Sequence, residues 1–313
     1  MIEKKTTFYS EGSLLQASFF LPESYKEGDE PLPLLIVNSG YQGFKDFYPK
    51  LFAELFTAQG FACLGFDYRG MAESEGPKGT VLLEQQVEDI LNAVTFAQTS
   101  PLVDPRRIGL LGWGMGAAHV IAAAAISQEV HAVVAMNGFY VGERWLKAIH
   151  TYDEWQGIQR TVREDRIRRV TTGESQLADT FEHYPLDPAT SEYVKNELEQ
   201  VPGFGHQTRL QFTESIIRMN VEKEVDRLQG IPLFIAHGED NSLHPFEEAE
   251  ALFQAAGFPK VLYRVSGRHN DFMYIDHPVF REMCAEIQSF VSDAFIASVN
   301  RSPVTRIQTA SPS

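Results

Sequence analysis

Short apolar runs alternate with amphipathic stretches along most of the chain. The runs at residues 34–37, 61–66, 107–111, 131–136, 231–236 and 261–265 have the length and composition of buried strands. Helical periodicity predicts helices over about residues 45–59, 81–98, 117–125 and 278–299. Two earlier segments, 6–9 and 14–21, predict an antiparallel hairpin turned at Glu11 and Gly12. This alternation is typical of an α/β fold with a mostly parallel sheet flanked by helices on both faces.

The alternation stops between residues 140 and 230. This segment has charged helical stretches at 157–170 and 191–200 and no clear strand. An insertion of this size between two core strands predicts a helical cap over the carboxyl edge of the sheet, where α/β sheets bind ligands. A surface decoration is the alternative. We therefore predict a core at residues 1–139 and 231–300, a helical cap at 140–230 and a disordered tail at 301–313.

Several aromatic residues lie near the ends of the predicted cap. They either line an apolar pocket or anchor the cap to the core: Phe139, Tyr140, Trp145, Tyr152, Trp155, Phe204 and Phe212.

The acidic composition narrows the range of partners. The 313 residues carry a formal charge of −15, which disfavours nucleic acid and anionic membrane surfaces. Only Cys63 and Cys284 occur as cysteines, so a disulfide framework is not expected. No apolar signal region or membrane-spanning stretch is seen. We expect a cytoplasmic protein that acts on a small molecule, and the oligomeric state is left open, with a homodimer as one option.

The most informative motif is Gly112-Trp113-Gly114-Met115-Gly116, between a predicted strand and a predicted helix. Its context is that of a G-x-S-x-G nucleophile elbow, but glycine occupies the position of the nucleophile. The glycines also approach a dinucleotide-binding fingerprint, which requires an acidic residue after the next strand. That strand ends in Asn137-Gly138, so no cofactor is expected. No cluster of His, Cys, Asp and Glu has metal-ligand spacing, so no metal is expected either.

Four segments carry a family resemblance. Residues 66–76 follow the pattern Asp-Tyr-Arg-Gly-x-Gly-x-Ser-x-Gly apart from Ala72, and residues 36–43 occupy the place of a strand that leads into an oxyanion loop. Residues 237–245 match an acid-bearing turn, and residues 267–270 match the loop of a catalytic histidine. With the elbow, these segments make the chain resemble the α/β-hydrolase superfamily over about residues 5–298. Within it, the chain looks most like cap-bearing serine hydrolases related to dienelactone hydrolases, peptidase-like esterases and fungal polyketide transferases.

The resemblance implies a degenerate catalytic triad. The family's serine falls on Gly114, and its aspartate falls on Asn241, with Asp240 one position earlier. An alternative acid position falls on Asn137, also an amide. Only the histidine, His269, is retained unambiguously. We favour Asp240 over Asn241 as the partner of the His269 ring, although a one-residue shift reverses a side chain on an extended segment.

The remaining groups still permit chemistry on a carbonyl compound. Glycine cannot form an acyl-enzyme, but the backbone N–H groups of Met115 and Tyr41 are expected to form an oxyanion hole. His269 is then the candidate general acid/base, acting on water or on the substrate directly. Ser39 and Trp113 are further substrate-binding candidates; Ser39 and the Tyr41 hydroxyl have capping of the loop as an alternative role.

Three functional interpretations follow. The first is an atypical enzyme, without a serine nucleophile, that acts on an ester, lactone, thioester or amide. Its setting would be specialised metabolism, such as natural product biosynthesis. Its reaction could be a hydrolysis or a lyase, isomerase or cyclase reaction. The second is an ordinary serine hydrolase inactivated by replacement of its elbow serine with Gly114. The third is a non-catalytic ligand-binding protein on a hydrolase fold. Retention of His269 together with the oxyanion loop favours the enzyme interpretations.

Overall fold

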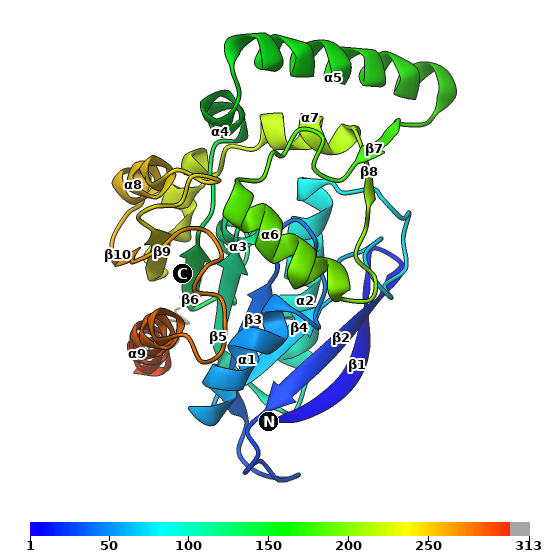
Figure 1. Cartoon of the computed structure of the whole chain (residues 1–313). Coiled ribbons are helices and arrows are strands. Elements are labelled where there is room, and N and C mark those ends of the chain that lie inside the picture. The colour runs from blue at the N-terminus through cyan, green and yellow to red at the C-terminus, as the bar shows by residue number, and fades with distance from the viewer. Residues whose placement is uncertain (301–313) are drawn as a thin grey trace, which may run out of the picture.

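The computed structural model describes residues 1–300, and the tail predicted to be disordered, residues 301–313, lies outside them. The fold is built on an eight-stranded sheet with the order β1-β2-β4-β3-β5-β6-β9-β10 (Figure 1). β2 is antiparallel to both of its neighbours, β1 and β4, and every other neighbouring pair is parallel. The predicted α/β class is therefore confirmed. The strands are β1 (Ile2–Ser10), β2 (Ser13–Leu21), β3 (Leu32–Asn38), β4 (Ala62–Phe66), β5 (Val103–Trp113), β6 (Ala132–Met136), β9 (Leu233–Gly238) and β10 (Lys260–Val265).

The sheet separates two hydrophobic cores. Along β3, Leu34 and Ile36 pack into one core, whereas Leu35 and Val37 pack into the other, because successive side chains of a strand point to opposite faces. Buried residues of α2, α3 and α8 fill the first core, and those of α1 and α9 fill the second. These helices are α1 (Tyr48–Ala58), α2 (Leu83–Thr99), α3 (Met115–Ala124), α8 (Phe246–Ala255) and α9 (Pro278–Asn300).

The carboxyl ends of the parallel strands meet at one edge of the sheet. Asn38 at the end of β3 is in register with Gly112 of β5, and Trp113 at the end of β5 is in register with Met136 of β6. Gly238 at the end of β9 is in register with Val265 of β10. The loops that follow these strands carry the predicted site residues, so the topology gathers them at this edge.

The helices of residues 142–218 lie beyond the carboxyl edge of the sheet in Figure 1, whereas residues 221–230 run beside α3 and α8 to the start of β9. Residues 140–230 contain α4 (Gly142–Ile149), α5 (Tyr152–Thr172), α6 (Pro188–Asn196), α7 (Gln211–Arg218) and the short 3₁₀ helices η1 (Leu198–Gln200), η2 (Val221–Lys223) and η3 (Val225–Leu228). The sequence analysis predicted no strand here, and this prediction is wrong. β7 (Leu177–Asp179) pairs with β8 (Gln207–Arg209) in a separate antiparallel sheet. Three-residue strands are too short for an alternating pattern to reveal them.

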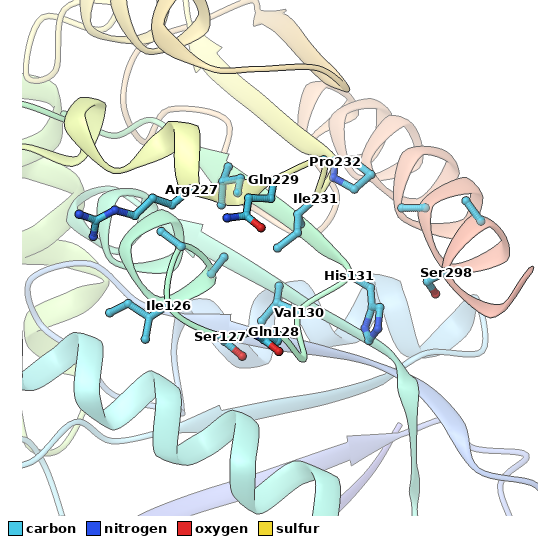
Figure 2. A pocket seen from close by; sticks show the side chains of 16 residues that line it. Ile126, Ser127, Gln128, Val130, His131, Arg227, Gln229, Ile231, Pro232 and Ser298 are labelled. Atoms are coloured by element: carbon cyan, nitrogen blue, oxygen red, sulfur yellow. The ribbon is translucent and has the colours of Figure 1, made fainter. Parts of the chain in front are cut away.

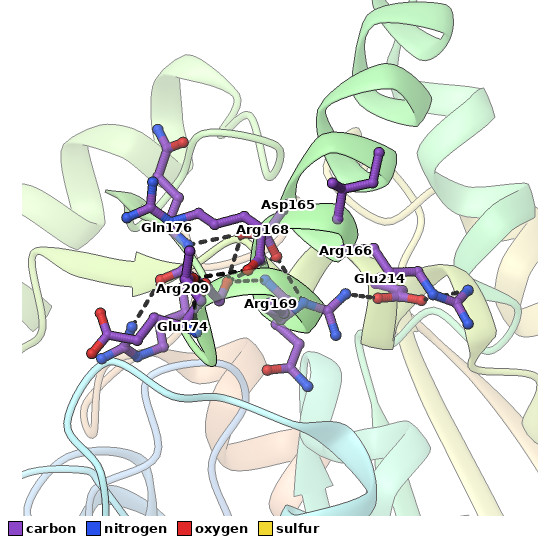
Figure 3. A network of polar contacts seen from close by, with 12 residues as sticks. Asp165, Arg166, Arg168, Arg169, Glu174, Gln176, Arg209 and Glu214 are labelled. Carbon is purple, nitrogen blue, oxygen red and sulfur yellow. Dashed lines mark hydrogen bonds and ion pairs between the residues drawn. The ribbon is translucent and has the colours of Figure 1, made fainter.

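A polar network joins the end of α5 to α7 and to the loop before β7 (Figure 3). The buried Asp165 carboxylate accepts hydrogen bonds from the Gln176 N–H at 2.8 Å and from the Ser175 hydroxyl at 2.9 Å. Arg169 bridges Asp165, at 3.0 Å, to Glu214 on α7. Because charged groups with little exposure are costly to leave unpaired, this network fixes α5 against the rest of the segment.

Candidate active site

Gly114 has the backbone of a nucleophile elbow. It joins β5 directly to α3 with φ of +59° and ψ of −125°, a conformation that side-chain-bearing residues adopt only under strain. A Cβ atom placed on Gly114 would have a single neighbour within 4 Å, the His269 Nε2 atom at 3.8 Å. The position of the missing side chain is therefore open and faces the histidine.

The flanking glycines are required by close packing of the turn. A Cβ atom on Gly116 would lie 2.3 Å from the Ser39 carbonyl oxygen, and one on Gly112 would lie 2.2 Å from the Gly116 carbonyl oxygen. Both distances are far below van der Waals contact with rigid backbone. These two glycines explain how α3 starts so close to the loop after β3.

The two predicted oxyanion-hole residues lie beside this turn. Met115 is the first residue of α3, so its N–H has no acceptor within the helix, and the Gly40 Cβ position is 3.3 Å from the Met115 nitrogen. Tyr41 follows Gly40 and lines the same pocket as Met115 and Gly114. Within residues 1–300 neither N–H is hydrogen-bonded to a protein acceptor. Both donors thus remain available to a ligand.

The side chains of the oxyanion loop have structural partners. The Tyr41 hydroxyl forms hydrogen bonds with the Thr180 carbonyl at 2.9 Å and with the Thr208 hydroxyl, and its ring stacks on Phe212 at 4.2 Å. The Ser39 hydroxyl donates to the Phe44 carbonyl at 3.2 Å. The alternative structural role therefore holds for both side chains, because their hydrogen bonds are used within the protein.

Asn241, and not the favoured Asp240, contacts the His269 ring. The Asn241 Nδ2 atom lies 3.0 Å from His269 Nδ1, and both residues are buried. The Asp240 side chain is exposed to solvent, and its backbone N–H donates to the Gly267 carbonyl. The preference for Asp240 is corrected by this geometry, since the turn after β9 points adjacent side chains in different directions.

Asn137 holds the loop that carries His269. Its Nδ2 donates to the His269 carbonyl oxygen at 2.8 Å, and its Oδ1 accepts from the Gly238 N–H at 2.7 Å. The amide thus joins the ends of β6 and β9 to the histidine loop. Asn137 contacts the backbone of His269 and not the ring.

Two further histidines, His237 and His244, lie next to Asn241, so the site contains three imidazole rings. The His244 ring packs edge-on against His269 with ring centroids 4.7 Å apart, and His237 Nε2 lies 3.4 Å from Asn241 Nδ2. Burial lowers the pKa of His269 to about 3, with a further contribution from His237. Burial likewise lowers the pKa of His237 to about 4 and that of His244 well below its usual range. All three rings are neutral at physiological pH.

His244 and Tyr184 are site residues that the sequence analysis missed. The Tyr184 hydroxyl lies 2.7 Å from His244 Nε2, while His244 Nδ1 faces the Asn137 carbonyl oxygen. Tyr184 comes from residues 140–230 and lines the pocket, so it links that segment to the histidine cluster. The signal for His244 was present in the motif at residues 237–245, whereas no motif marked Tyr184.

A small, partly open pocket of about 60 Å³ lies over Gly114. Its floor includes Trp113, whose ring lies 5.6 Å from the His269 ring and stacks at 5.6 Å on Tyr48. None of the described lining residues is charged. Residues 140–230 contribute Phe181, Tyr184, Leu186, Thr190, Val194 and Leu198, and the core contributes Gly40, Tyr41, Gln42, Tyr48, Trp113, Gly114, Met115, Leu243, His269 and Asn270.

The aromatic residues near the ends of residues 140–230 do not line this pocket. Trp145 stacks on Phe139 at 4.0 Å and donates its indole N–H to the Leu243 carbonyl at 2.8 Å. Tyr152 is 76% exposed. For Trp145 and Phe139, anchoring to the core is therefore the role observed.

A larger groove lies at the opposite edge of the sheet. It is formed where β6 and β9 begin, and Figure 2 shows Arg227 and Gln229 on one wall and Ile126 and His131 on the other. Because it lies at the amino ends of the strands, it contains none of the predicted site residues. Residues 1–300 contain no group of three or more His, Cys, Asp or Glu placed to hold a metal ion. In the same range, none of the helices has both the length and the apolar character to cross a membrane.

Comparisons with known proteins agree with this architecture. An uncharacterized 31.7 kDa protein of the traX-finO intergenic region of Escherichia coli is 29% identical over 245 residues, which cover 76% of this chain and 82% of that protein. Thiohydrolase aneE of Aspergillus aculeatus is 36% identical over 110 residues, 35% of each chain. The crystal structure of the α/β hydrolase GrgF from Penicillium sp. sh18 superimposes with a TM-score of 0.79 at 21% identity, covering 95% of this chain and all (100%) of that one.

Residues 33–278 also match the family described as alpha/beta hydrolase fold. This match spans most of the chain, including the elbow, the turn of Asn241 and the loop of His269. The chain therefore belongs to the α/β-hydrolase fold family.

Proposed function

We propose that this protein is an enzyme that acts on a carbonyl-bearing small molecule without forming a serine acyl-enzyme. Its substrate is an ester, lactone, thioester or amide, and residues 140–230 act as a cap that closes the pocket. The observation that carries the proposal is the open space at Gly114, which faces His269 Nε2 in a buried, uncharged pocket. A pocket of this kind disfavours a charged ligand, because burying an unpaired charge is costly.

In this proposal the oxyanion hole supplies the main catalytic effect. The N–H groups of Met115 and Tyr41 stabilise negative charge that develops on the carbonyl oxygen. An oxyanion hole and binding pocket can retain roughly 10³ to 10⁴-fold catalysis over water after a triad residue is lost. His269 is the proton-transfer or hydrogen-bonding group at the reacting atoms, and whether its Nε2 donates or accepts depends on which ring nitrogen carries the proton.

Asn241 disfavours the interpretation of an ordinary serine hydrolase inactivated at one position. Replacement of the elbow serine alone would leave a carboxylate beside the histidine, but here the side chain in that place is an uncharged amide. In a serine protease, an Asp-to-Asn change at this position lowers kcat by roughly 10⁴-fold. Two independent departures from the triad support a site that works without acyl transfer.

The name of one relative is compatible with a carbonyl substrate. The Aspergillus relative is named a thiohydrolase, and its match covers 35% of that chain and 35% of this one. A thioester substrate is therefore among those to test. A ligand-binding protein without catalysis is less well supported, because binding alone does not require a buried histidine facing the elbow.

The proposal is tested with a panel of acyl thioesters, lactones and aryl esters. The parent protein should turn over at least one of them with no acyl adduct in intact-mass spectra taken during turnover. His269→Gln keeps the size and polarity of the side chain and should lower this turnover roughly 10²-fold or more. His206→Gln is the matched control, because His206 is exposed and does not line the pocket, and it should leave turnover unchanged. An acyl adduct, or equal turnover in His269→Gln and the parent, would contradict the proposal.

A further inference from the structure

The orientation of the Asn241 side-chain amide is fixed by a backbone donor. The His244 N–H lies 3.0 Å from the Asn241 Oδ1 atom, and a backbone N–H can only donate. The atom that faces it must therefore be the amide oxygen. The opposite orientation would place the NH₂ group against the N–H, with two donors in contact. The NH₂ group consequently points to the other side, toward His269 Nδ1 at 3.0 Å.

This orientation determines which ring nitrogen of His269 carries the proton. An NH₂ group needs an acceptor, and Nδ1 of a neutral imidazole is an acceptor only when the proton is on Nε2. His237 does not compete, because its Nε2 faces the His244 carbonyl oxygen at 2.7 Å and is therefore the protonated nitrogen of that ring. Desolvation keeps His269 neutral, since its side chain is buried among neutral rings.

We propose that Asn241 is a positioning residue that locks His269 in its Nε2–H form, so that the site presents a hydrogen-bond donor, and no base, at the position of the missing nucleophile. This inference rests on the proposed function and deepens it. In a serine hydrolase the acid accepts from Nδ1–H, which leaves the Nε2 lone pair free to take the serine proton. Here the amide reverses that arrangement.

The reversed tautomer specifies the substrate class. With the N–H groups of Met115 and Tyr41 on one carbonyl oxygen, Nε2–H of His269 can donate to a second acceptor beside Gly114. Among the proposed substrates, this arrangement favours an uncharged lactone or ester, which has two acceptor oxygens close together, over a thioester or an amide, and a 1,3-dicarbonyl compound presents the same pair of acceptors. A neutral imidazole polarises such an oxygen as a hydrogen-bond donor while its proton remains on Nε2, as known for another enzyme family.

The tautomer is measured directly by NMR of the protein labelled with ¹⁵N-histidine. Two-bond ¹H–¹⁵N spectra separate protonated from unprotonated ring nitrogens, and the His269 signals are assigned by their loss in His269→Gln. At neutral pH we expect Nε2 to be protonated and Nδ1 to be unprotonated. In Asn241→Asp the carboxylate should accept from Nδ1–H and exchange the two signals. A proton on Nδ1 in the parent protein would overturn the inference, whatever the enzyme's activity.

A reconstituted nucleophile tests the consequence for reactivity. Gly114→Ser alone places a hydroxyl beside Nε2–H, which cannot accept its proton, whereas Gly114→Ser combined with Asn241→Asp restores the lone pair. The double variant should react with a fluorophosphonate up to roughly 10⁴-fold faster than Gly114→Ser, the cost of the wrong tautomer in a serine protease. Equal labelling rates in the two variants would overturn the inference. Failure of both to label would contradict the elbow geometry on which the proposed function rests, while the NMR result still decides the tautomer.

Discussion

Substitution of Gly114 by alanine should expose the strain that an elbow imposes on a residue with a side chain. The Cβ atom meets only His269 Nε2, at 3.8 Å, so no steric clash is expected. The φ of +59° is instead the source of the cost, about 1–3 kcal/mol for a non-glycine residue in a sparsely populated region. Alanine also restricts the unfolded chain, which stabilises the protein by about 0.4–1 kcal/mol. The net expectation is a loss of about 0–2.6 kcal/mol.

Gly257→Ala is the matched control for this measurement. Gly257 is exposed, has no atom within 4 Å of its Cβ position and lies outside the positive-φ region. It should gain the unfolded-state term without the strain, so the difference between the two variants isolates the strain at about 1–3 kcal/mol. Urea unfolding of both variants and the parent, followed by circular dichroism, gives the three free energies of unfolding. Equal stability of Gly114→Ala and Gly257→Ala would refute the strained elbow.

Three further predictions address the site. Asn241→Ala should lower turnover and change the His269 NMR signals, whereas Asp240→Ala should alter neither, because only Asn241 contacts the ring. Tyr41→Phe removes the hydrogen bonds to Thr180 and Thr208, so hydrogen exchange in residues 178–210 should increase while the spectrum of the core is retained. Buried neutral histidines should make stability fall as the pH drops below about 6.5, by about 1.4 kcal/mol per pH unit for each ring until its folded pKa is reached. His119→Leu should reduce the slope of stability against pH by about 1.4 kcal/mol per pH unit, the contribution of one ring. Burial lowers the pKa of His119 to about 3, and neither of its ring nitrogens has a hydrogen-bond partner in the described residues. An unchanged slope would contradict this assignment.

The periodicity of the sequence was sufficient to predict the core of the fold. The runs at residues 131–136 and 231–236 became β6 and β9, since buried parallel strands are nearly continuous apolar segments. The same approach missed β7 and β8, whose three residues each cannot display a period, and it gave no signal for α8.

The site was predicted in its loops but not in its contacts. Gly114 and His269 were recognised because each lies in a motif with a fixed position in the fold. The choice between Asp240 and Asn241 depends on the direction of side chains in one turn, which neighbouring sequence does not determine. The tautomer of His269 depends on a bond from the His244 N–H, a contact that only the three-dimensional structure provides.

The central claim is that the site binds and activates a carbonyl compound through hydrogen-bond donors, without a covalent intermediate. The most direct test is a crystal structure of the parent protein soaked with 2,4-pentanedione, a small uncharged 1,3-dicarbonyl probe that suits the small pocket. We predict one oxygen within about 3 Å of the Met115 and Tyr41 nitrogens, the second within hydrogen-bond distance of His269 Nε2, and no covalent bond to the protein. A probe bound only outside this pocket, or joined covalently to a side chain within it, would contradict the account.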